Sequence, residues 1–186
     1  MTDASRYLRY QLRLQLALAF VVFFSSCQSQ PQSTPMNYSV VKELDLQRYL
    51  GTWYEIARFP HSFEKGLQGV TATYSLRDDG LIRVENKGYK NTLDGKMSVS
   101  VGKAKRRSDT EPARFKVSFF WFFYAPYDVM ELDPDYQWAL IGSASPDYLW
   151  ILSRTPQMDE GLYQSIVQKA RDRGFDTSKL IRVQQR

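Results

Sequence analysis

The chain has little histidine and little cysteine, and this scarcity argues against several kinds of site. Its 186 residues include one histidine, His61, and one cysteine, Cys27. A zinc site takes three or four protein ligands, and a catalytic triad needs a histidine beside a nucleophile and an acid. We therefore predict that His61 is a loop residue and that the chain holds no metal and no cofactor, haem included.

The pattern also lacks a pair of acids placed for catalysis. Four carboxylates on or near recognisable strands have no evident catalytic partner: Glu55, Glu64, Asp128 and Glu131. Acid–base catalysis needs a proton donor or acceptor positioned at the reacting group. We expect no catalytic residue and no enzymatic activity.

The apolar run near the start of the chain is too short for a comfortable membrane-spanning helix. Residues 14–24 are apolar apart from Gln15 and follow a start that carries three arginines, whereas a spanning helix needs ~20 apolar residues. A basic start, a short apolar stretch and small residues before a cleavage site are typical of a secretory signal. We predict that residues 1–26 are a signal peptide.

Residues 24–27, Phe-Ser-Ser-Cys, resemble the bacterial lipobox, in which the cysteine is acylated and becomes the mature N-terminus. The resemblance implies lipidation of Cys27 and, because Gln28 rather than Asp follows it, anchoring in the bacterial outer membrane. An exported protein with one cysteine forms no internal disulfide, which fits a cysteine reserved for a lipid. An uncleaved signal anchor and a soluble secreted protein are the alternatives. Residues 27–38 are polar and contain prolines, which predicts an extended tether.

The remaining residues, 39–186, have the size of a single domain. The whole chain is 15% aromatic and has a net charge of +5. The aromatic excess favours a roomy ligand pocket, since a compact core does not require it. The basic residues gather only at Lys103–Arg107. We interpret this cluster as a solvated hairpin tip, or a contact for anionic lipid headgroups, and expect no nucleic-acid partner.

Short segments with period-two alternation, separated by turn residues, recur along this domain. Residues 70–76 are apolar at every second position, and Asp79-Gly80 and Asp94-Gly95 supply hairpin turns. The predicted strands are 52–59, 70–76, 81–89, 97–105, 113–123, 127–132, 136–143 and 147–153. Their even spacing predicts an all-β fold, an eight-stranded up-and-down antiparallel β-barrel, which closes around one small ligand.

One helix is expected after the strands. Apolar residues recur at helical spacing over 162–170, and Gly174 stands where a C-terminal cap belongs. We predict that this C-terminal α-helix packs on the outside of the barrel and that residues 180–183 add an edge strand.

Two motifs about a hundred residues apart, Gly51-Thr52-Trp53 and Leu152-Ser153-Arg154, resemble the first and last barrel strands of the lipocalin family. Residues 49–58, 70–80, 86–89, 116–120 and 147–156 also match the family, in order. The family's Thr-Asp-Tyr motif is replaced by Pro134-Asp135-Tyr136. The resemblance is nearest to the bacterial outer-membrane lipocalins and apolipoprotein D. It implies a lipocalin calyx whose floor is closed by Arg154 lying over Trp53.

Alternation and correspondence with the family's pocket positions predict the ligand-binding residues of the inner wall. They are Tyr74, Asn86, Phe119, Trp121, Phe123, Trp138 and Trp150. For any single aromatic residue, packing under the helix outside the barrel is the alternative. An inward amide at Asn86 needs a polar partner, which a ligand carboxylate, a headgroup or a trapped water would supply.

The five successive aromatic residues at 119–123 cannot all lie on one face of a strand. Some of them must be exposed at the rim of the barrel, and exposed apolar area generally marks an interaction site. A membrane-facing lip and a contact between two copies in a homodimer are both open.

The family resemblance implies a calyx that binds a fatty acid or lysophospholipid, in lipid storage, transport or membrane repair. We therefore expect a non-catalytic outer-membrane lipoprotein that carries a hydrophobic ligand in its barrel. An enzyme acting on an apolar lipid-like substrate in the same cavity is the main alternative. A structural lipoprotein with a filled barrel is another.

Overall fold

The computed structural model describes residues 35–120 and 122–186. The predicted signal peptide, Cys27, most of the predicted tether and Trp121 lie outside the described residues. The strands are β1 (Gly51–Arg58), β2 (Leu67–Leu76), β3 (Ile82–Lys90), β4 (Met97–Arg106), β5 (Arg114–Phe120), β6 (Phe123–Leu132), β7 (Trp138–Gly142), β8 (Leu149–Ser153) and β9 (Ile181–Arg182). The helices are α2 (Leu46–Tyr49) and α3 (Glu160–Asp172), with 3-10 turns η1 (Ser62–Glu64) and η2 (Thr177–Lys179).

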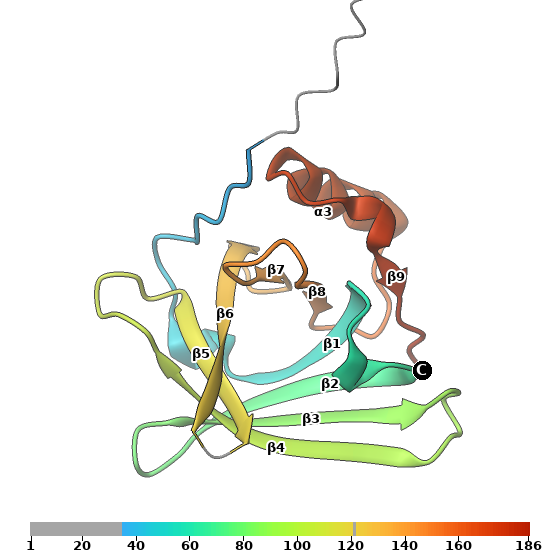
Figure 1. Ribbon diagram of the computed structural model, residues 1–186, viewed down its shortest axis with the longest axis horizontal. Coiled ribbons are helices and arrows are strands. Elements are labelled where there is room, and N and C mark those ends of the chain that lie inside the picture. Colours follow the sequence, from blue (N-terminus) through green and yellow to red (C-terminus); the bar gives the residue numbers. More distant parts are fainter. Residues whose placement is uncertain (1–34, 121) are drawn as a thin grey trace, which may run out of the picture. The chain divides into compact units, whose positions relative to one another are not determined.

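The sheet closes on itself through its first strand (Figure 1). Each strand from β1 to β7 pairs with the next in antiparallel order, and β8 pairs with β1. At one level Tyr54 therefore lies between Thr71 of β2 and Ser153 of β8. The predicted eight-stranded up-and-down antiparallel barrel is confirmed. The expected edge strand is also present, because β9 pairs with β1.

The up-and-down order places the loops after β1, β3, β5 and β7 at one end of the barrel, which we call the mouth. The β5–β6 turn at this end differs from the prediction. Alternation predicts one strand over 113–123, whereas β5 ends at Phe120 and β6 begins at Phe123. No glycine or proline marks this turn, so the unbroken aromatic run conceals it.

The basic cluster also differs from its predicted place at a hairpin tip. Lys103, Lys105 and Arg106 belong to the end of β4. Arg107 follows the strand and donates a hydrogen bond of 3.1 Å to the buried carboxylate of Asp128.

Alternation along the strands divides the buried side chains between two clusters. The inner cluster draws on strands all round the barrel and includes Trp53, Tyr74, Val84, Phe115, Val129 and Ile141. The outer cluster lies between the barrel and α3 and includes Ile56, Met130, Leu140, Ile151, Tyr163 and Ile166. A register shift in β1 between Glu55 and Ala57 moves Ala57 to the outer cluster, although simple alternation places it on the face of Trp53.

Helix α3 covers the outside of the barrel beside β7 and β8 (Figure 1). The Asp159 side chain caps the helix by accepting a hydrogen bond from the Leu162 amide at 2.9 Å. Beyond its C-terminus Gly174 has a φ of +91°, in the left-handed region that favours glycine. The predicted C-terminal helix outside the barrel is therefore confirmed.

Candidate ligand-binding site

The floor of the barrel is built around Trp53 and Arg154. The guanidinium carbon of Arg154 lies 3.8 Å from the centre of the fully buried Trp53 ring. The same guanidinium donates hydrogen bonds of 2.7–3.2 Å to the backbone carbonyls of Arg48, Tyr49, Thr52 and Tyr136. These contacts join the end of β8 to α2, to the start of β1 and to the β6–β7 loop, so that one cation connects four segments at the closed end.

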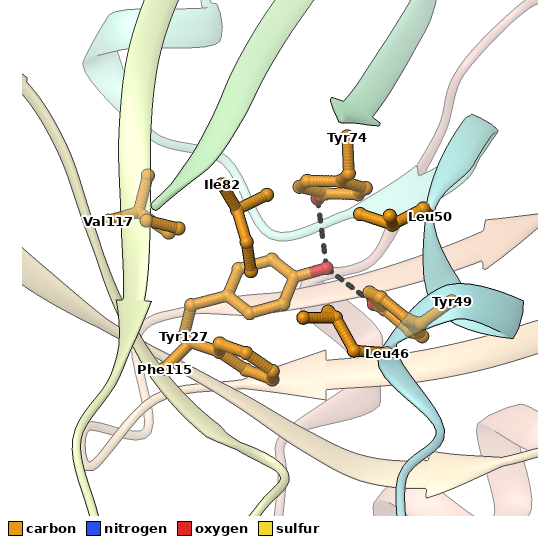
Figure 2. Close-up of a pocket in the computed structure, with 9 residues that line it drawn as sticks. Leu46, Tyr49, Leu50, Tyr74, Ile82, Phe115, Val117 and Tyr127 are labelled. Carbon is orange, nitrogen blue, oxygen red and sulfur yellow. Dashed lines mark hydrogen bonds between the residues drawn. The ribbon is translucent and has the colours of Figure 1, made fainter. Parts of the chain in front are cut away.

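An apolar pocket lies next to this floor (Figure 2). Its lining comes from α2, the residue after it and five strands: Leu46, Tyr49, Leu50, Tyr74, Ile82, Ala104, Phe115, Val117 and Tyr127. The free cavity among these side chains is only about 10 Å³, roughly the space of one water molecule. The pocket is narrower than the roomy cavity that the composition favours, because the rings of Tyr49, Tyr74, Phe115 and Tyr127 point into it (Figure 2). Its apolar lining suits a hydrocarbon chain.

Three tyrosine hydroxyls meet inside this pocket and satisfy one another (Figure 2). Tyr74 donates to the Tyr127 hydroxyl at 2.9 Å, and the hydroxyls of Tyr127 and Tyr49 share a second hydrogen bond of 2.7 Å. Burial raises the pKa of all three hydroxyls above the ordinary value, so they stay neutral at physiological pH. The pocket thus gains polar atoms without gaining charge, and these atoms already have partners.

A second group of polar side chains is buried near the mouth, where β1 ends. We call it the mouth cluster, and it consists of Glu55, Arg58, His61 and Glu64. Arg58 donates a hydrogen bond of 2.6 Å to the Glu55 carboxylate and two more, of 2.9 and 3.0 Å, to the carbonyls of Glu64 and Leu67. The Glu64 carboxylate accepts a hydrogen bond of 3.2 Å from the Trp150 indole. These bonds fasten the loop between β1 and β2 to strands β1 and β8.

His61 belongs to this mouth cluster. Its ring stacks on Phe63 with 4.1 Å between ring centres, and its Nε2 lies 3.3 Å from a carboxylate oxygen of Glu64. Neither ring nitrogen makes a hydrogen bond to another described residue. Burial, with a smaller effect from Arg58, lowers the pKa of His61 to about 4. The imidazole is therefore neutral at pH 7.

The two glutamates of the mouth cluster are also perturbed. Burial raises the pKa of Glu55 and of Glu64, and the neighbouring Glu64 charge raises that of Glu55 further. The sequence gives no sign that these two acids are neighbours, because Glu64 lies outside the strands, at the end of the 3-10 turn η1. The structure brings them together through Arg58, whose role no spacing in the sequence indicates.

Four of the seven predicted ligand residues face into the barrel. Tyr74 lines the pocket, and Phe119 and Trp150 pack against the inner cluster. Asn86 lies opposite Ala72, which in turn lies opposite Trp53, so the three share the inner face. The side-chain oxygen of Asn86 is buried and has no hydrogen-bond partner among the described residues.

The structure corrects the placement of two further residues. Trp138 packs against the outer cluster, because its neighbour Ala139 belongs to the inner cluster and successive side chains alternate. Outer packing is the alternative expected for a single aromatic residue. Phe123 is 70% exposed at the β5–β6 turn instead of lining the wall, because β6 only begins there. Trp121 lies outside the described residues. The pocket residues that the sequence analysis did not identify include Tyr127. It lies two positions before the buried Val129 on β6 and so shares its face of the strand.

The family model described as a lipocalin-like domain matches residues 44–185, a range that contains every strand of the closed barrel. The chain belongs to the lipocalin family. This lipocalin is 49% identical over 170 residues to outer membrane lipoprotein Blc of Escherichia coli (strain K12), covering 91% of the chain and 95% of that protein. It is 39% identical over 127 residues to apolipoprotein D of Bos taurus, covering 64% and 65%.

A solved structure gives an independent comparison of the fold. The lipocalin aligns with insecticyanin from the tobacco hornworm Manduca sexta at a TM-score of 0.62 and 21% identity, covering 80% of the chain and 86% of the insecticyanin chain. At this identity the similarity concerns the fold alone.

Within residues 35–120 and 122–186, no three histidine, cysteine or acidic side chains are grouped so as to hold a metal ion. In the same residues no helix combines the length and the apolar character that crossing a bilayer requires.

Proposed function

We propose that this lipocalin binds the acyl chain of a fatty acid or lysophospholipid inside its barrel, and stores or transports that lipid in the bacterial envelope. The observation that carries the proposal is the apolar pocket at the closed end, lined by side chains of five strands and α2. A closed sheet shields such a pocket from water on all sides except the mouth. Burial of each methylene contributes ~0.8 kcal/mol.

The proposed location is the outer membrane. Residues 1–26 would be removed as a signal peptide, Cys27 would carry the lipid anchor, and residues 27–38 would tether the domain of residues 39–186. The name of the Escherichia coli relative, an outer membrane lipoprotein, supports this location.

The proposed ligand lies with its tail at the floor and its polar end towards the mouth. The lining next to the floor is apolar or aromatic, whereas unpartnered polar atoms lie on the inner face at Asn86 and near the mouth at His61. Long tails would extend past the narrow pocket, between the half-buried side chains of Phe119 and Trp150. These two aromatic side chains, and the tyrosine and phenylalanine rings that line the pocket, would have to shift, because the free cavity is only about 10 Å³.

A titration with fatty acids of rising chain length, followed by tryptophan fluorescence, tests the proposal. Because each methylene contributes ~0.8 kcal/mol, affinity should rise up to about fourfold per carbon until the tail no longer fits. A response that is absent, or equal at every length, would contradict the proposal. The same protein incubated with lipid esters should release no product, and turnover would favour the enzyme alternative.

A further inference from the structure

The turn between β5 and β6 exposes an unusual amount of aromatic surface at the mouth. Phe120, Phe122 and Phe123, which we call the aromatic tip, are 75%, 72% and 70% exposed. The rings of Phe122 and Phe123 contact each other, with 4.6 Å between their centres. Single exposed apolar residues are common, but three at one turn form a patch of the kind that marks an interaction site.

The outer surface of β4 continues this apolar area. Met97, Val99 and Val101, the apolar stripe, are 52%, 47% and 50% exposed. These three residues occupy every second position of β4, on the face opposite to that of Ala104. Because Ala104 belongs to the inner cluster, they point away from the barrel interior. Met97 begins β4 at the mouth, and the stripe therefore starts at the same end of the barrel as the aromatic tip.

Three lysines follow on the same outer surface. The amino groups of Lys103, Lys105 and Lys116, the lysine cluster, lie 6.0, 5.5 and 5.5 Å from the centre of the Tyr124 ring. Lys105 and Lys116 are directly opposite each other on β4 and β5. Along β4, outward positions are thus apolar near the mouth and basic farther from it.

The neighbouring acidic side chains do not neutralise the lysine cluster. Glu85 of β3, the acid opposite Val101, is paired with Arg83 at 2.8 Å. No ion pair of the lysine cluster with an acid is found in the described residues. Three cations around one ring repel one another, so an anionic partner would lower their free energy.

We propose that the aromatic tip, the apolar stripe and the lysine cluster together form a face that docks on a bilayer containing anionic phospholipid. The aromatic tip inserts at the level of the headgroups, and the lysines contact lipid phosphates, each contributing roughly a fivefold gain in affinity. This contact goes beyond the proposed function, since it requires neither the anchor on Cys27 nor a ligand in the pocket.

A second copy of the chain fits the same face less well. A two-fold interface brings the same patch of both copies together, so the two lysine clusters would approach each other. In a bilayer the apolar interior lies beneath the anionic headgroups. The outer surface of the barrel matches this arrangement, because its apolar side chains lie at the mouth and its lysines lie farther from the mouth. Docking also turns the mouth towards the lipid. The exposed Phe63 of the β1–β2 loop lies at the mouth as well.

Cosedimentation of the unlipidated domain with vesicles tests the proposal. Residues 35–186 include every strand of the closed sheet and form one compact unit, so this part can be produced alone. Its binding to vesicles of phosphatidylethanolamine with phosphatidylglycerol is compared with binding to phosphatidylcholine vesicles, at low and high salt. The protein should bind the anionic vesicles, and salt should weaken the binding.

Two variants and two matched controls locate the contact. The double variant Phe120→Ser/Phe122→Ser and the triple variant Lys103→Gln/Lys105→Gln/Lys116→Gln should each bind anionic vesicles at least tenfold more weakly. The controls remove exposed groups away from the proposed face, in Leu76→Ser and in Lys42→Gln/Lys169→Gln/Arg171→Gln. The controls should bind as the wild type does, and circular dichroism should show all five proteins folded.

Three results would overturn the proposal. They are no binding by the wild type, equal binding to neutral and anionic vesicles, and equal losses in the patch variants and their controls. Analytical ultracentrifugation of the same samples tests the homodimer. A dimer that disappears in the Phe120→Ser/Phe122→Ser variant, together with no vesicle binding, would assign the face to a second copy.

Discussion

Arg154 supports the floor of the barrel through more contacts than its position over Trp53. Its guanidinium also satisfies four backbone carbonyls, which belong to α2, to β1 and to the loop between β6 and β7. Without Arg154, these carbonyls lose their hydrogen-bond donor and the buried Trp53 ring loses the cation that lies over it, and both losses cost free energy.

The substitution Arg154→Ala should therefore lower the free energy of unfolding by about 1–3 kcal/mol. Urea denaturation followed by tryptophan fluorescence measures this change. Arg171→Ala on the exposed side of α3 is the control, and it should alter stability by less than about 0.5 kcal/mol. An Arg154→Ala variant as stable as the wild type would show that the floor does not depend on this cation.

His61 makes stability depend on pH in a defined direction. Burial lowers its pKa to about 4 in the folded protein, whereas an unfolded chain has an ordinary histidine pKa near 6.5. Below pH 6.5 the unfolded state therefore binds a proton that the folded state resists, and folding loses free energy until the pH reaches about 4. The raised pKa values of Glu55 and Glu64 act in the opposite sense, because the folded state holds their protons more tightly.

Comparison with His61→Gln isolates the histidine contribution. Between pH 7 and pH 4.5 the wild type should lose about 2–3 kcal/mol relative to the variant, as expected for a histidine pKa that falls from near 6.5 to about 4. Urea denaturation of both proteins at the two pH values gives the difference. A difference between the proteins that stays constant with pH would mean that His61 titrates normally in the folded state.

At the scale of elements, the strands were predictable where turn residues punctuate them. Asp79-Gly80 and Asp94-Gly95 locate the β2–β3 and β3–β4 turns correctly. The β5–β6 turn lies within an aromatic run and has no such signal. The register shift in β1 is likewise invisible in the sequence, because Ala57 is small and apolar and fits either face. The prediction that Trp138 faces the ligand was wrong for a related reason. Alternation determines which residues share a face of a strand, but it does not show which face is inside the barrel.

The site follows the same division. The pairing of Trp53 with Arg154 is implied by the family motifs, and the structure places the two together. The mouth cluster was not predictable, because Arg58 reaches Glu64 through an irregular loop whose path depends on tertiary contacts. The width of the pocket was not predictable either, since it depends on the rotamers of rings such as Tyr127 rather than on their number.

Helix α3 offers a test of an element that covers the barrel without forming it. Asp159→Ala removes the side chain that caps the Leu162 amide, and should lower the free energy of unfolding by about 0.5–2 kcal/mol. Asp172→Ala, at the other end of the helix, is the matched control. It removes an acid from the negative end of the helix dipole, so we expect little change or a slight gain in stability. Equal losses in both variants would contradict the assigned cap.

For the whole molecule, the closed sheet and the apolar lining fit the proposed function, the enclosure of a hydrocarbon chain. The inner cluster closes the floor, the tyrosine hydroxyls satisfy one another, and the mouth cluster holds the entrance loop. The proposed bilayer contact would direct the entrance towards the lipid from which a ligand comes. The proposed function requires that the hydrocarbon tail of the ligand lies in the barrel interior.

The most direct test fills the pocket from within and measures which acyl chains still bind. Ala104→Phe and Val117→Phe each add bulk to the pocket lining, whereas Ser75→Phe adds a ring to the outside of β2. Dissociation constants for fatty acids of rising length should show a shorter maximum chain in both pocket variants and an unchanged maximum in Ser75→Phe. The same length dependence in the wild type and all three variants would place the hydrocarbon outside the barrel.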